Sequence, residues 1–257
     1  MDYSVVIPVY NESQNIRQLS ERILTVMDSL SGDYEVIYVD DGSTDATYDM
    51  LSTIAFSNPR ICVISFRRNY GQHPAVVAGL EQAHGRLVIT LDADLQNPPE
   101  EIPRLLETMK AGFDMVCGRR QQRRDSFLRR AGSLLVNLYF TFLSGVYLKD
   151  NGTMLRVLTQ RTAKEFARRY HGERLYIPLL ILKITKNITE VGVQHADRLS
   201  GESRYNLKKL IVILWVLTVR YHPAFYRFLQ RVGFARRDGE LYSLKKKIVQ
   251  SREVAIA

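Results

Sequence analysis

Residues 87–96 form the segment Leu-Val-Ile-Thr-Leu-Asp-Ala-Asp-Leu-Gln, an apolar run that ends in alternating polar side chains. Similar β-branched runs occur at 3–9, 34–39, 61–66 and 113–117, and segments with helical periodicity lie between them. This alternation predicts strands that are each followed by a helix. Such an order is typical of a mostly parallel sheet flanked by helices. We therefore expect an α/β fold in which the quoted run is one of the strands.

Polar clusters follow three of these predicted strands. Asn11-Glu12 comes after the first run, Asp40-Asp41-Gly42-Ser43 after the second, and Asp92-Ala-Asp94 after the fourth. Ligands of open α/β sheets bind beyond the carboxyl ends of the strands. The three clusters are therefore expected to meet in one crevice.

The cluster after 87–91 has the composition of a metal site. In extended backbone, alternate side chains face the same way, so Asp92, Asp94 and Gln96 can share one hard cation. Mg²⁺ or Mn²⁺ that keeps positions open for phosphate oxygens is the expected occupant. The alternative is a solvated loop whose aspartate caps the helix predicted to start near Pro98.

The cluster after the second strand, residues 40–45, combines aspartates with a glycine and two hydroxyl side chains. Gly42 permits a tight turn, and Ser43 or Thr44 can cap the following helix. A carboxylate here can accept a hydrogen bond from a uracil N–H group or a ribose hydroxyl. The alternative is a helix N-terminal capping box without a ligand.

The bulk composition fits a folded, basic protein. The 257 residues are 46% apolar and 25% charged, with a formal net charge of +9, which predicts a packed core and anionic partners such as nucleotide phosphates or lipid head groups. Cys62 and Cys117 both lie in apolar runs and are expected to be buried free thiols. Because no basic flank or cleavage site precedes the first strand, we predict no secretory signal and a cytoplasmic location.

The sequence after residue 118 changes in character. An Arg-rich loop at 119–130 precedes an apolar helix predicted at about 131–147, and mixed elements continue to about 205. Residues 206–257 are basic and predicted to be helical. We therefore divide the chain into a catalytic domain, 1–205, and a tail, 206–257.

The tail contains no run long enough to cross a membrane. The apolar stretch Leu210–Val219 would extend only about 15 Å as a helix, against a hydrocarbon layer of roughly 30 Å. Aromatic residues such as Trp215 and Tyr221 lie beside arginines, as in helices that lie at an anionic membrane surface. We expect a peripheral contact with the cytoplasmic face of the membrane; packing of 206–232 on the protein is the alternative.

Several motifs together resemble a known family. Val6-Ile-Pro8-Val-Tyr10-Asn11-Glu12, Val39-Asp-Asp41-Gly-Ser43 and Asp92-Ala-Asp94-Leu-Gln96-Asn-Pro-Pro are similar to segments of family 2 glycosyltransferases. Arg68-Asn69-Tyr70-Gly71-Gln72-His73 and the Arg-x-x-Gly-x-Ser segment at 198–203 resemble the polyprenyl-phosphate sugar transferases within that family. The resemblance extends over about 3–210 and implies a GT-A (Rossmann-like) fold. The C-terminal amphipathic helices expected from the tail depart from the transmembrane helices of many relatives.

The resemblance also implies roles for individual residues. The nucleotide-sugar donor would be held by Pro8, Tyr10, Glu12, Asp41, Asp92 and Arg119. A Mg²⁺ or Mn²⁺ cofactor would be bound by Asp92, Asp94 and Gln96. The phosphates and the acceptor would be bound by Arg129, Ser133, Arg198, Ser203 and Arg204, where the family usually has Lys in place of Arg204. The residues expected to act in the transfer itself are Asp94, Arg129 and Arg198.

The implied reaction is inverting transfer of a sugar, from UDP rather than GDP according to the nearest likeness, to polyprenyl (undecaprenyl) phosphate. A phosphate monoester is already nucleophilic at neutral pH, so this acceptor needs no general base. One alternative is a peripheral glycosyltransferase that extends a polysaccharide or a lipid-linked oligosaccharide and therefore needs a carboxylate base. A module that binds nucleotides or nucleic acid is a more distant alternative; the chain lacks the motifs of nucleic-acid readers, so no nucleic-acid partner is expected. The oligomeric state is left open.

Overall fold

The computed structural model describes most of the chain up to residue 195 and two strands near its end. The described residues are 1–121, 138, 141, 145–150, 153–173, 183–195, 244–249 and 252–254.

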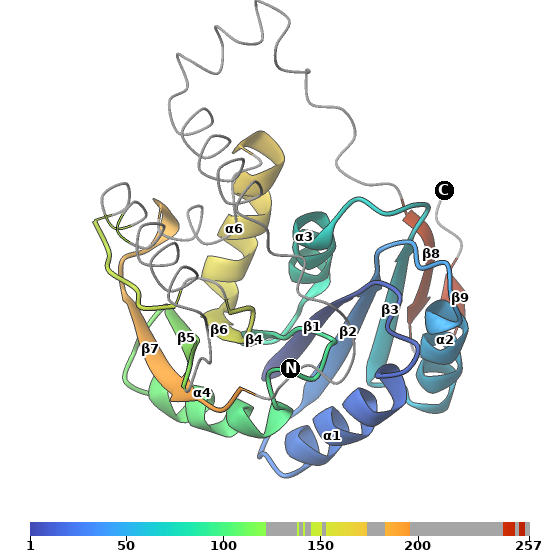
Figure 1. Ribbon diagram of the computed structural model, residues 1–257, viewed down its shortest axis with the longest axis horizontal. Helices are drawn as coiled ribbons and strands as arrows, with labels where there is room; N and C mark the ends of the chain where they lie inside the picture. Colours follow the sequence, from blue (N-terminus) through green and yellow to red (C-terminus); the bar gives the residue numbers. More distant parts are fainter. Residues whose placement is uncertain are drawn as a thin grey trace, which may run out of the picture.

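Strands and helices alternate through the first half of the chain, as the apolar runs predict (Figure 1). The strands there are β1 (Tyr3–Val9), β2 (Tyr34–Asp40), β3 (Ile61–Phe66), β4 (Leu87–Thr90) and β5 (Met115–Arg120). The helices between them are α1 (Ile16–Asp28), α2 (Thr47–Ser57), α3 (Gln72–Gln82), the short 3₁₀ turn η1 (Pro99–Glu101) and α4 (Ile102–Met109). Further along the chain lie β6 (Arg156–Thr159), α6 (Gln160–Glu173), β7 (Ile188–Val193), β8 (Leu244–Val249) and β9 (Arg252–Val254).

The described strands form one mixed sheet in the order β7-β5-β6-β4-β1-β2-β3-β8-β9. Strands β1 to β4 pair in parallel, whereas β6 enters antiparallel between β4 and β5, and β7 pairs in parallel with β5. The expected mostly parallel sheet is confirmed. Because β1, β2 and β4 are neighbours that run in one direction, their carboxyl ends open on the same edge.

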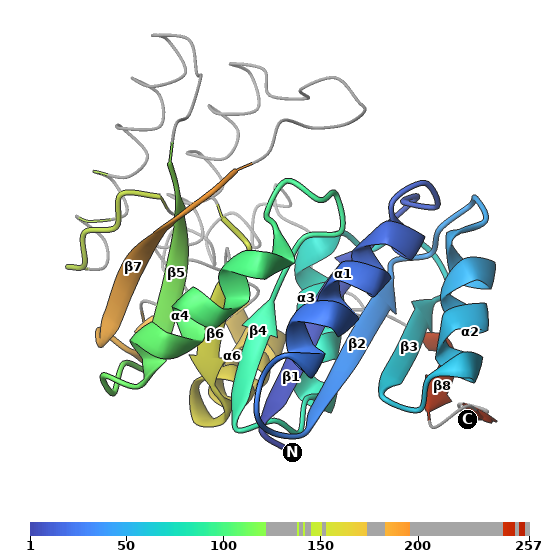
Figure 2. The ribbon, with the colours of Figure 1, turned by 90° about the horizontal axis from the view of Figure 1, so that it is seen from below.

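Helices cover both faces of this sheet (Figure 2). One apolar cluster packs α1, α2 and α4 against one face and includes Val5 and Ile7 of β1. The other packs α3 and α6 against the opposite face and includes Val6. Successive residues of a strand point to opposite faces, so β1 must be apolar at nearly every position, which explains its continuous apolar run.

The C-terminal strands correct one expectation. Residues 244–254 belong to the tail that the sequence predicts to be helical, but β8 pairs antiparallel with β3 and β9 pairs with β8. Without β8, the outer side of β3 would be an open edge whose backbone N–H and C=O groups have no ladder partners. The basic composition of this segment does not reveal that long-range pairing. The rest of the tail, 206–243, 250–251 and 255–257, and most of the predicted helix at 131–147 lie outside the described residues.

Among the described helices, none combines the length and the apolar character needed to cross a bilayer.

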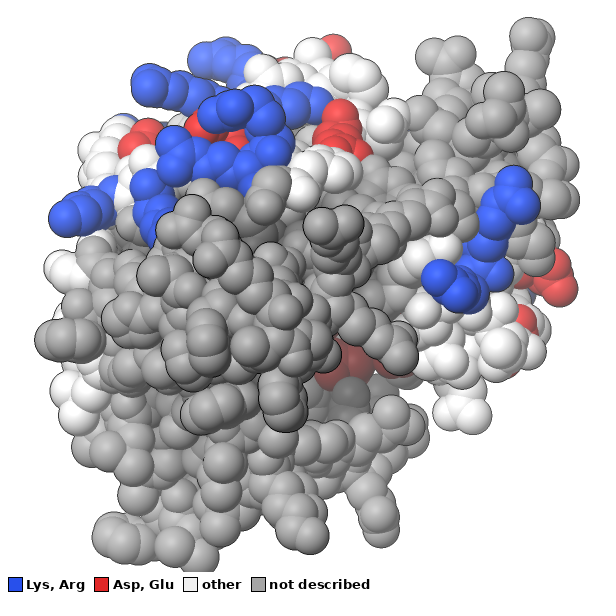
Figure 3. Space-filling model, turned by 90° about the horizontal axis from the view of Figure 1, so that it is seen from above, with Lys and Arg blue, Asp and Glu red and all other residues white. Residues whose placement is uncertain are grey.

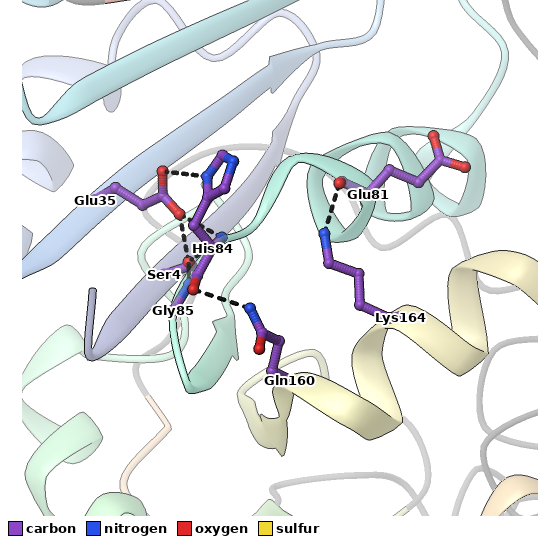
Figure 4. Close-up of polar contacts among 7 residues, drawn as sticks. All are labelled: Ser4, Glu35, Glu81, His84, Gly85, Gln160 and Lys164. Atoms are coloured by element: carbon purple, nitrogen blue, oxygen red, sulfur yellow. Dashed lines mark hydrogen bonds and ion pairs between the residues drawn. The ribbon is translucent and has the colours of Figure 1, made fainter.

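A polar network lies at the amino ends of the strands, away from the polar clusters that follow their carboxyl ends (Figure 4). It joins the turn before β4 to β1, β2 and α6. The Ser4 hydroxyl donates to Glu35 at 2.6 Å and accepts hydrogen bonds from the backbone N–H groups of His84 and Gly85, at 3.1 and 2.7 Å. Glu35 also accepts from the His84 N–H group at 2.7 Å. Gln160 at the start of α6 donates to the His84 carbonyl at 2.9 Å. The network therefore fixes β1, β2, the 83–86 turn and α6 relative to one another.

We expect Ser4→Ala to destabilise the fold. Ser4 is fully buried, so loss of its hydroxyl leaves the Gly85 N–H group without its acceptor, which costs about 1–3 kcal/mol. The matched control is Ser57→Ala, because Ser57 is exposed and its hydroxyl bonds only to the Ile54 carbonyl of its own helix. Chemical denaturation of the two variants measures the difference. Equal unfolding free energies for both variants would contradict this interpretation of the network.

Candidate active site

The carboxyl edge of the sheet carries a cavity of about 420 Å³. Its walls come from the end of β1, from the loops that follow β1, β2, β3 and β4, and from the first residue of α3. The lining residues are Pro8, Val9, Tyr10, Glu12, Asp41, Asn69, Gly71, Gln72, Asp92, Ala93 and Asp94. The structure therefore brings together six residues that the sequence analysis singled out, namely Pro8, Tyr10, Glu12, Asp41, Asp92 and Asp94.

A larger cavity of about 610 Å³ lies along α6 and the segment that precedes β7. Its charged lining is largely paired within itself, since Glu165 accepts hydrogen bonds from Arg168 and Arg169. In Figure 3, Lys and Arg side chains gather on one part of the described surface with Asp and Glu side chains among them. We favour the smaller cavity as the reaction site because polar groups from several strand ends converge there.

The loop after β1 is held by the loop after β2. The Asn11 N–H group donates to the Ser43 hydroxyl at 3.0 Å, and the Asn11 side-chain oxygen accepts from the Thr44 N–H group at 2.9 Å. The Glu12 N–H group donates to the Thr47 hydroxyl at 2.9 Å. Asn11 adopts a φ of 53°, a left-handed conformation that asparagine tolerates better than most residues. Tyr10 and Glu12 therefore project from a braced loop.

The two adjacent aspartates after β2 have different partners. Asp40 accepts hydrogen bonds from the Ser43 N–H group at 3.0 Å and from the Ser65 hydroxyl at 2.8 Å, which ties the strand ends together. Asp41 accepts from the N–H groups of Tyr70 and Gly71, at 2.7 and 2.8 Å. Asp41 is 3% exposed, and this burial raises the pKa of its carboxyl in spite of both hydrogen bonds. Asp41 therefore holds the loop before α3 in addition to lining the cavity.

Gly42 lets the 40–43 turn lie directly on the loop after β3. Its φ is 70°, as the predicted tight turn requires, and a Cβ atom there would lie 2.4 Å from the Arg68 carbonyl carbon. Glycine is the one residue type that permits both the left-handed φ and this close approach of two backbones.

The loop after β3 brings residues to the site that the sequence analysis did not include. Asn69, Gly71 and Gln72 line the cavity, and Gln72 donates to Asp92 at 2.5 Å. These residues lie in the quoted 68–73 motif, which follows a predicted strand on the same sheet edge as the three polar clusters. That position was the available signal for assigning them to the site.

Asp92, Asp94 and Gln96 are all partly exposed, whereas Ala93, Leu95 and Asn97 between them are buried. The expected extended backbone is wrong, however, because β4 ends at Thr90 and Leu95 adopts a φ of 58°. The segment is a turn in which Asp94 accepts from the Gln96 N–H group at 3.1 Å. Asp92 and Asp94 line the cavity, and Gln96 is not among its lining residues.

These carboxylates fit a divalent cation. Burial, followed by the neighbouring charge of Asp94, raises the pKa of Asp92 to about 7, and a cation between the two would offset both effects. The described residues contain no group of three or more His, Cys, Asp or Glu side chains arranged to hold a metal. Two carboxylates leave most coordination positions open for phosphate oxygens, which suits an ion that arrives with a diphosphate better than a permanent structural ion.

Arginines lie beside this end of the site. Arg119 and Arg120 end β5, and Arg120 forms a bidentate ion pair with buried Asp150, at 2.7 and 2.8 Å. The charges of Arg156 and Arg120 both act to lower the pKa of Asp92. Arg119 is partly exposed and is not among the residues that line the cavity. The predicted phosphate-binding residues Arg129, Ser133, Arg198, Ser203 and Arg204 lie outside the described residues.

The sequence profile described as "Glycosyl transferase family 2" matches residues 4–168. Two similar curated relatives are the undecaprenyl-phosphate 4-deoxy-4-formamido-L-arabinose transferases of Serratia proteamaculans and Proteus mirabilis. They are 44% and 43% identical to this chain, and each alignment covers 90% of this chain and 71% of the relative.

Solved structures of lower sequence similarity share the fold. Glucosyl-3-phosphoglycerate synthase from Mycobacterium tuberculosis, in complex with Mn²⁺, UDP-glucose and phosphoglyceric acid, is 19% identical with a TM-score of 0.55, over 91% of this chain and 81% of that one. Residues 1–349 of S. aureus TarS, in complex with UDP-GlcNAc, are 17% identical with a TM-score of 0.56, over 92% and 74% of the two chains.

Proposed function

This chain belongs to glycosyl transferase family 2, and on that premise we propose that it transfers a sugar from a nucleotide diphosphate to a polyprenyl phosphate. The observation that carries the proposal is the convergence of Asp41, Asp92 and Asp94 in one cavity beyond the strand ends. The acceptor is inferred from the relatives that are 44% and 43% identical and named for transfer to undecaprenyl phosphate. We propose UDP as the nucleotide.

In the proposed complex, the nucleoside lies against the loops after β1 and β2. Pro8, Tyr10 and Glu12 would form one wall, and Asp41 would accept a hydrogen bond from the base or the ribose. A carboxylate oxygen has more than one lone pair, so Asp41 can bind the nucleoside while it keeps its bonds to Tyr70 and Gly71. Arg119 would contribute positive charge from the end of β5.

The diphosphate would lie at the Asp92 and Asp94 end of the cavity. A divalent ion bound there, Mn²⁺ or Mg²⁺, would offset the negative charge that develops on the leaving nucleotide diphosphate. Asp92 and Asp94 would hold the ion, and Gln96 would contribute an amide oxygen. Gln72 would keep Asp92 in place through its 2.5 Å hydrogen bond.

The transfer would be a single in-line displacement. An oxygen of the lipid phosphate forms a bond to the anomeric carbon while the bond from that carbon to the diphosphate oxygen breaks, so the configuration inverts. The phosphate brings its own negative charge, so no protein base has to remove a proton. We propose that Arg129, Ser133, Arg198, Ser203 and Arg204 bind the acceptor and donor phosphates.

We also propose that the protein acts at the cytoplasmic face of the membrane, where it meets its lipid acceptor. In this proposal residues 1–205 form the catalytic domain, and the aromatic and basic part of the tail, 206–232, lies at the anionic surface. The strands β8 and β9 are assigned to the catalytic sheet, because β8 pairs with β3.

The test is transfer from a panel of UDP- and GDP-sugars with Mn²⁺ or Mg²⁺. Three acceptors are compared: a short-chain polyprenyl phosphate, the matching polyprenol without phosphate, and an oligosaccharide. We expect a sugar–phospholipid with the phosphate alone, and product is measured by mass spectrometry. Transfer to the polyprenol or the oligosaccharide would contradict the acceptor assignment and indicate an enzyme that uses a general base.

A further inference from the structure

An arginine lies inside the apolar layer between the sheet and helices α3 and α6. Arg156, the first residue of β6, is 4% exposed. Met154 and Leu158, two positions away on either side, belong to the cluster that includes α3 and α6, whereas Leu155 and Val157 belong to the opposite cluster. Because side chains alternate along a strand, Arg156 faces α3 and α6.

The register of β6 brings Arg156 close to the site. It pairs with Thr90 of β4, two residues before Asp92, and with Cys117 of β5. Helix α3 covers the face of the sheet to which Arg156 points, and its first two residues are Gln72 and His73. Gln72 donates a hydrogen bond to Asp92. The strand register therefore places Arg156 close to the turn that carries Asp92, and Gln72 at the amino end of α3 is bonded to that same carboxylate.

The charge of Arg156 acts on two neighbouring elements there. Burial and, to a smaller extent, the charge of Arg156 lower the pKa of His73 on α3 to about 4. Burial raises the pKa of Cys117 on β5 to about 11, although the charge of Arg156 opposes that rise.

We infer that Arg156 is a positioning residue whose buried positive charge favours negative charge at the Asp92 end of the cavity, and so helps to hold the donor diphosphate. The inference rests on the proposed function only in taking that diphosphate as the ligand. The charge acts through Asp92 and the field at the cavity floor, without contact with the sugar. A charge in a medium of low polarity acts over a longer range than one in water, and it needs no rearrangement when the ligand arrives.

This arrangement predicts opposite effects on two ligands. A buried positive charge attracts a diphosphate and repels a divalent cation. Arg156→Met removes the charge and keeps an unbranched side chain, so it is expected to weaken UDP binding about tenfold and to tighten Mn²⁺ binding several-fold. Mn²⁺ binding to the protein without nucleotide is measured by electron paramagnetic resonance, and UDP binding at saturating Mn²⁺ by calorimetry. The control is Arg161→Met, which removes a positive charge from the exposed surface of α6 and should change neither affinity.

A merely structural role predicts a different result. Loss of packing would lower the affinities for UDP and for Mn²⁺ together. That outcome, or an unchanged UDP affinity in Arg156→Met, overturns the inference. If Arg156→Met does not fold, Arg156→Lys decides, because it retains the charge: affinities within about threefold of the parent support the inference, and a tenfold loss of UDP affinity overturns it. Neither measurement requires sugar transfer. The test therefore remains valid even if polyprenyl phosphate is not the acceptor.

Discussion

Asp94→Asn is expected to lower turnover about a thousandfold, the order of effect that loss of a single group stabilising transition-state charge can produce. The asparagine keeps an oxygen that can accept the hydrogen bond from the Gln96 N–H group, which Asp94 receives at 3.1 Å. The turn should therefore retain its shape while the site loses one of the two carboxylates that would hold the metal. Initial rates at saturating donor and lipid phosphate measure the effect.

Two controls separate a loss of metal binding from general damage. Asp49→Asn removes a negative charge from the exposed first turn of α2 and should transfer sugar at the parent rate. Treatment of the parent with a chelator should abolish transfer, and added Mn²⁺ should restore it. Parent-like turnover in Asp94→Asn, or full activity in the presence of the chelator, would remove the basis of the metal assignment.

Gly42→Ala is expected to disrupt the donor site through the backbone. Its new Cβ atom would lie 2.4 to 2.8 Å from backbone atoms of Arg68, so the 40–43 turn and the loop after β3 must move apart. That movement would break the bonds from Asp41 to the Tyr70 and Gly71 N–H groups. We expect a loss of about 3 kcal/mol in unfolding free energy and donor affinity weakened at least about tenfold.

The matched control is Gly112→Ala. Gly112 also has a left-handed φ, 87°, but nothing lies within 4 Å of the position of its Cβ atom. This variant carries the backbone strain alone, about 1 kcal/mol, and should bind donor normally. Denaturation and UDP titration of both variants measure the difference. If Gly42→Ala lowers the unfolding free energy and the UDP affinity no more than Gly112→Ala does, the close contact between the 40–43 turn and the loop after β3 is not needed for stability or donor binding.

The predicted strands agree with the structure to within a few residues. Their signal was strong because β1, β2 and β3 are covered on both faces, so nearly every position must be apolar. The largest difference is at 113–117, where β5 extends from Met115 to Arg120. Its last two residues are charged, and the ladder with β7 continues through them, which local hydrophobicity does not reveal.

The site could be predicted in part for a related reason. Polar side chains that follow parallel strands must meet at one edge, so the order of residues along the chain is enough to group Glu12, Asp41 and Asp92. Gln72 follows the third predicted strand and could have been grouped with them, but its hydrogen bond to Asp92 depends on the packing of α3. Arg156 could not be grouped in this way, because it follows no predicted strand and enters the sheet antiparallel between β4 and β5.

The sequence by itself determined the α/β class, the strands of the first half and the location of the acidic crevice, because these follow from local periodicity and from the direction of parallel strands. Tertiary structure alone decided that β8 closes the β3 edge, that Asp41 braces the loop before α3, and that the buried Arg156 pairs with Thr90, two residues before Asp92. Each of these depends on contacts between residues far apart in the chain. Such contacts arise only when the whole sheet sets the register, and no window of the sequence contains both partners.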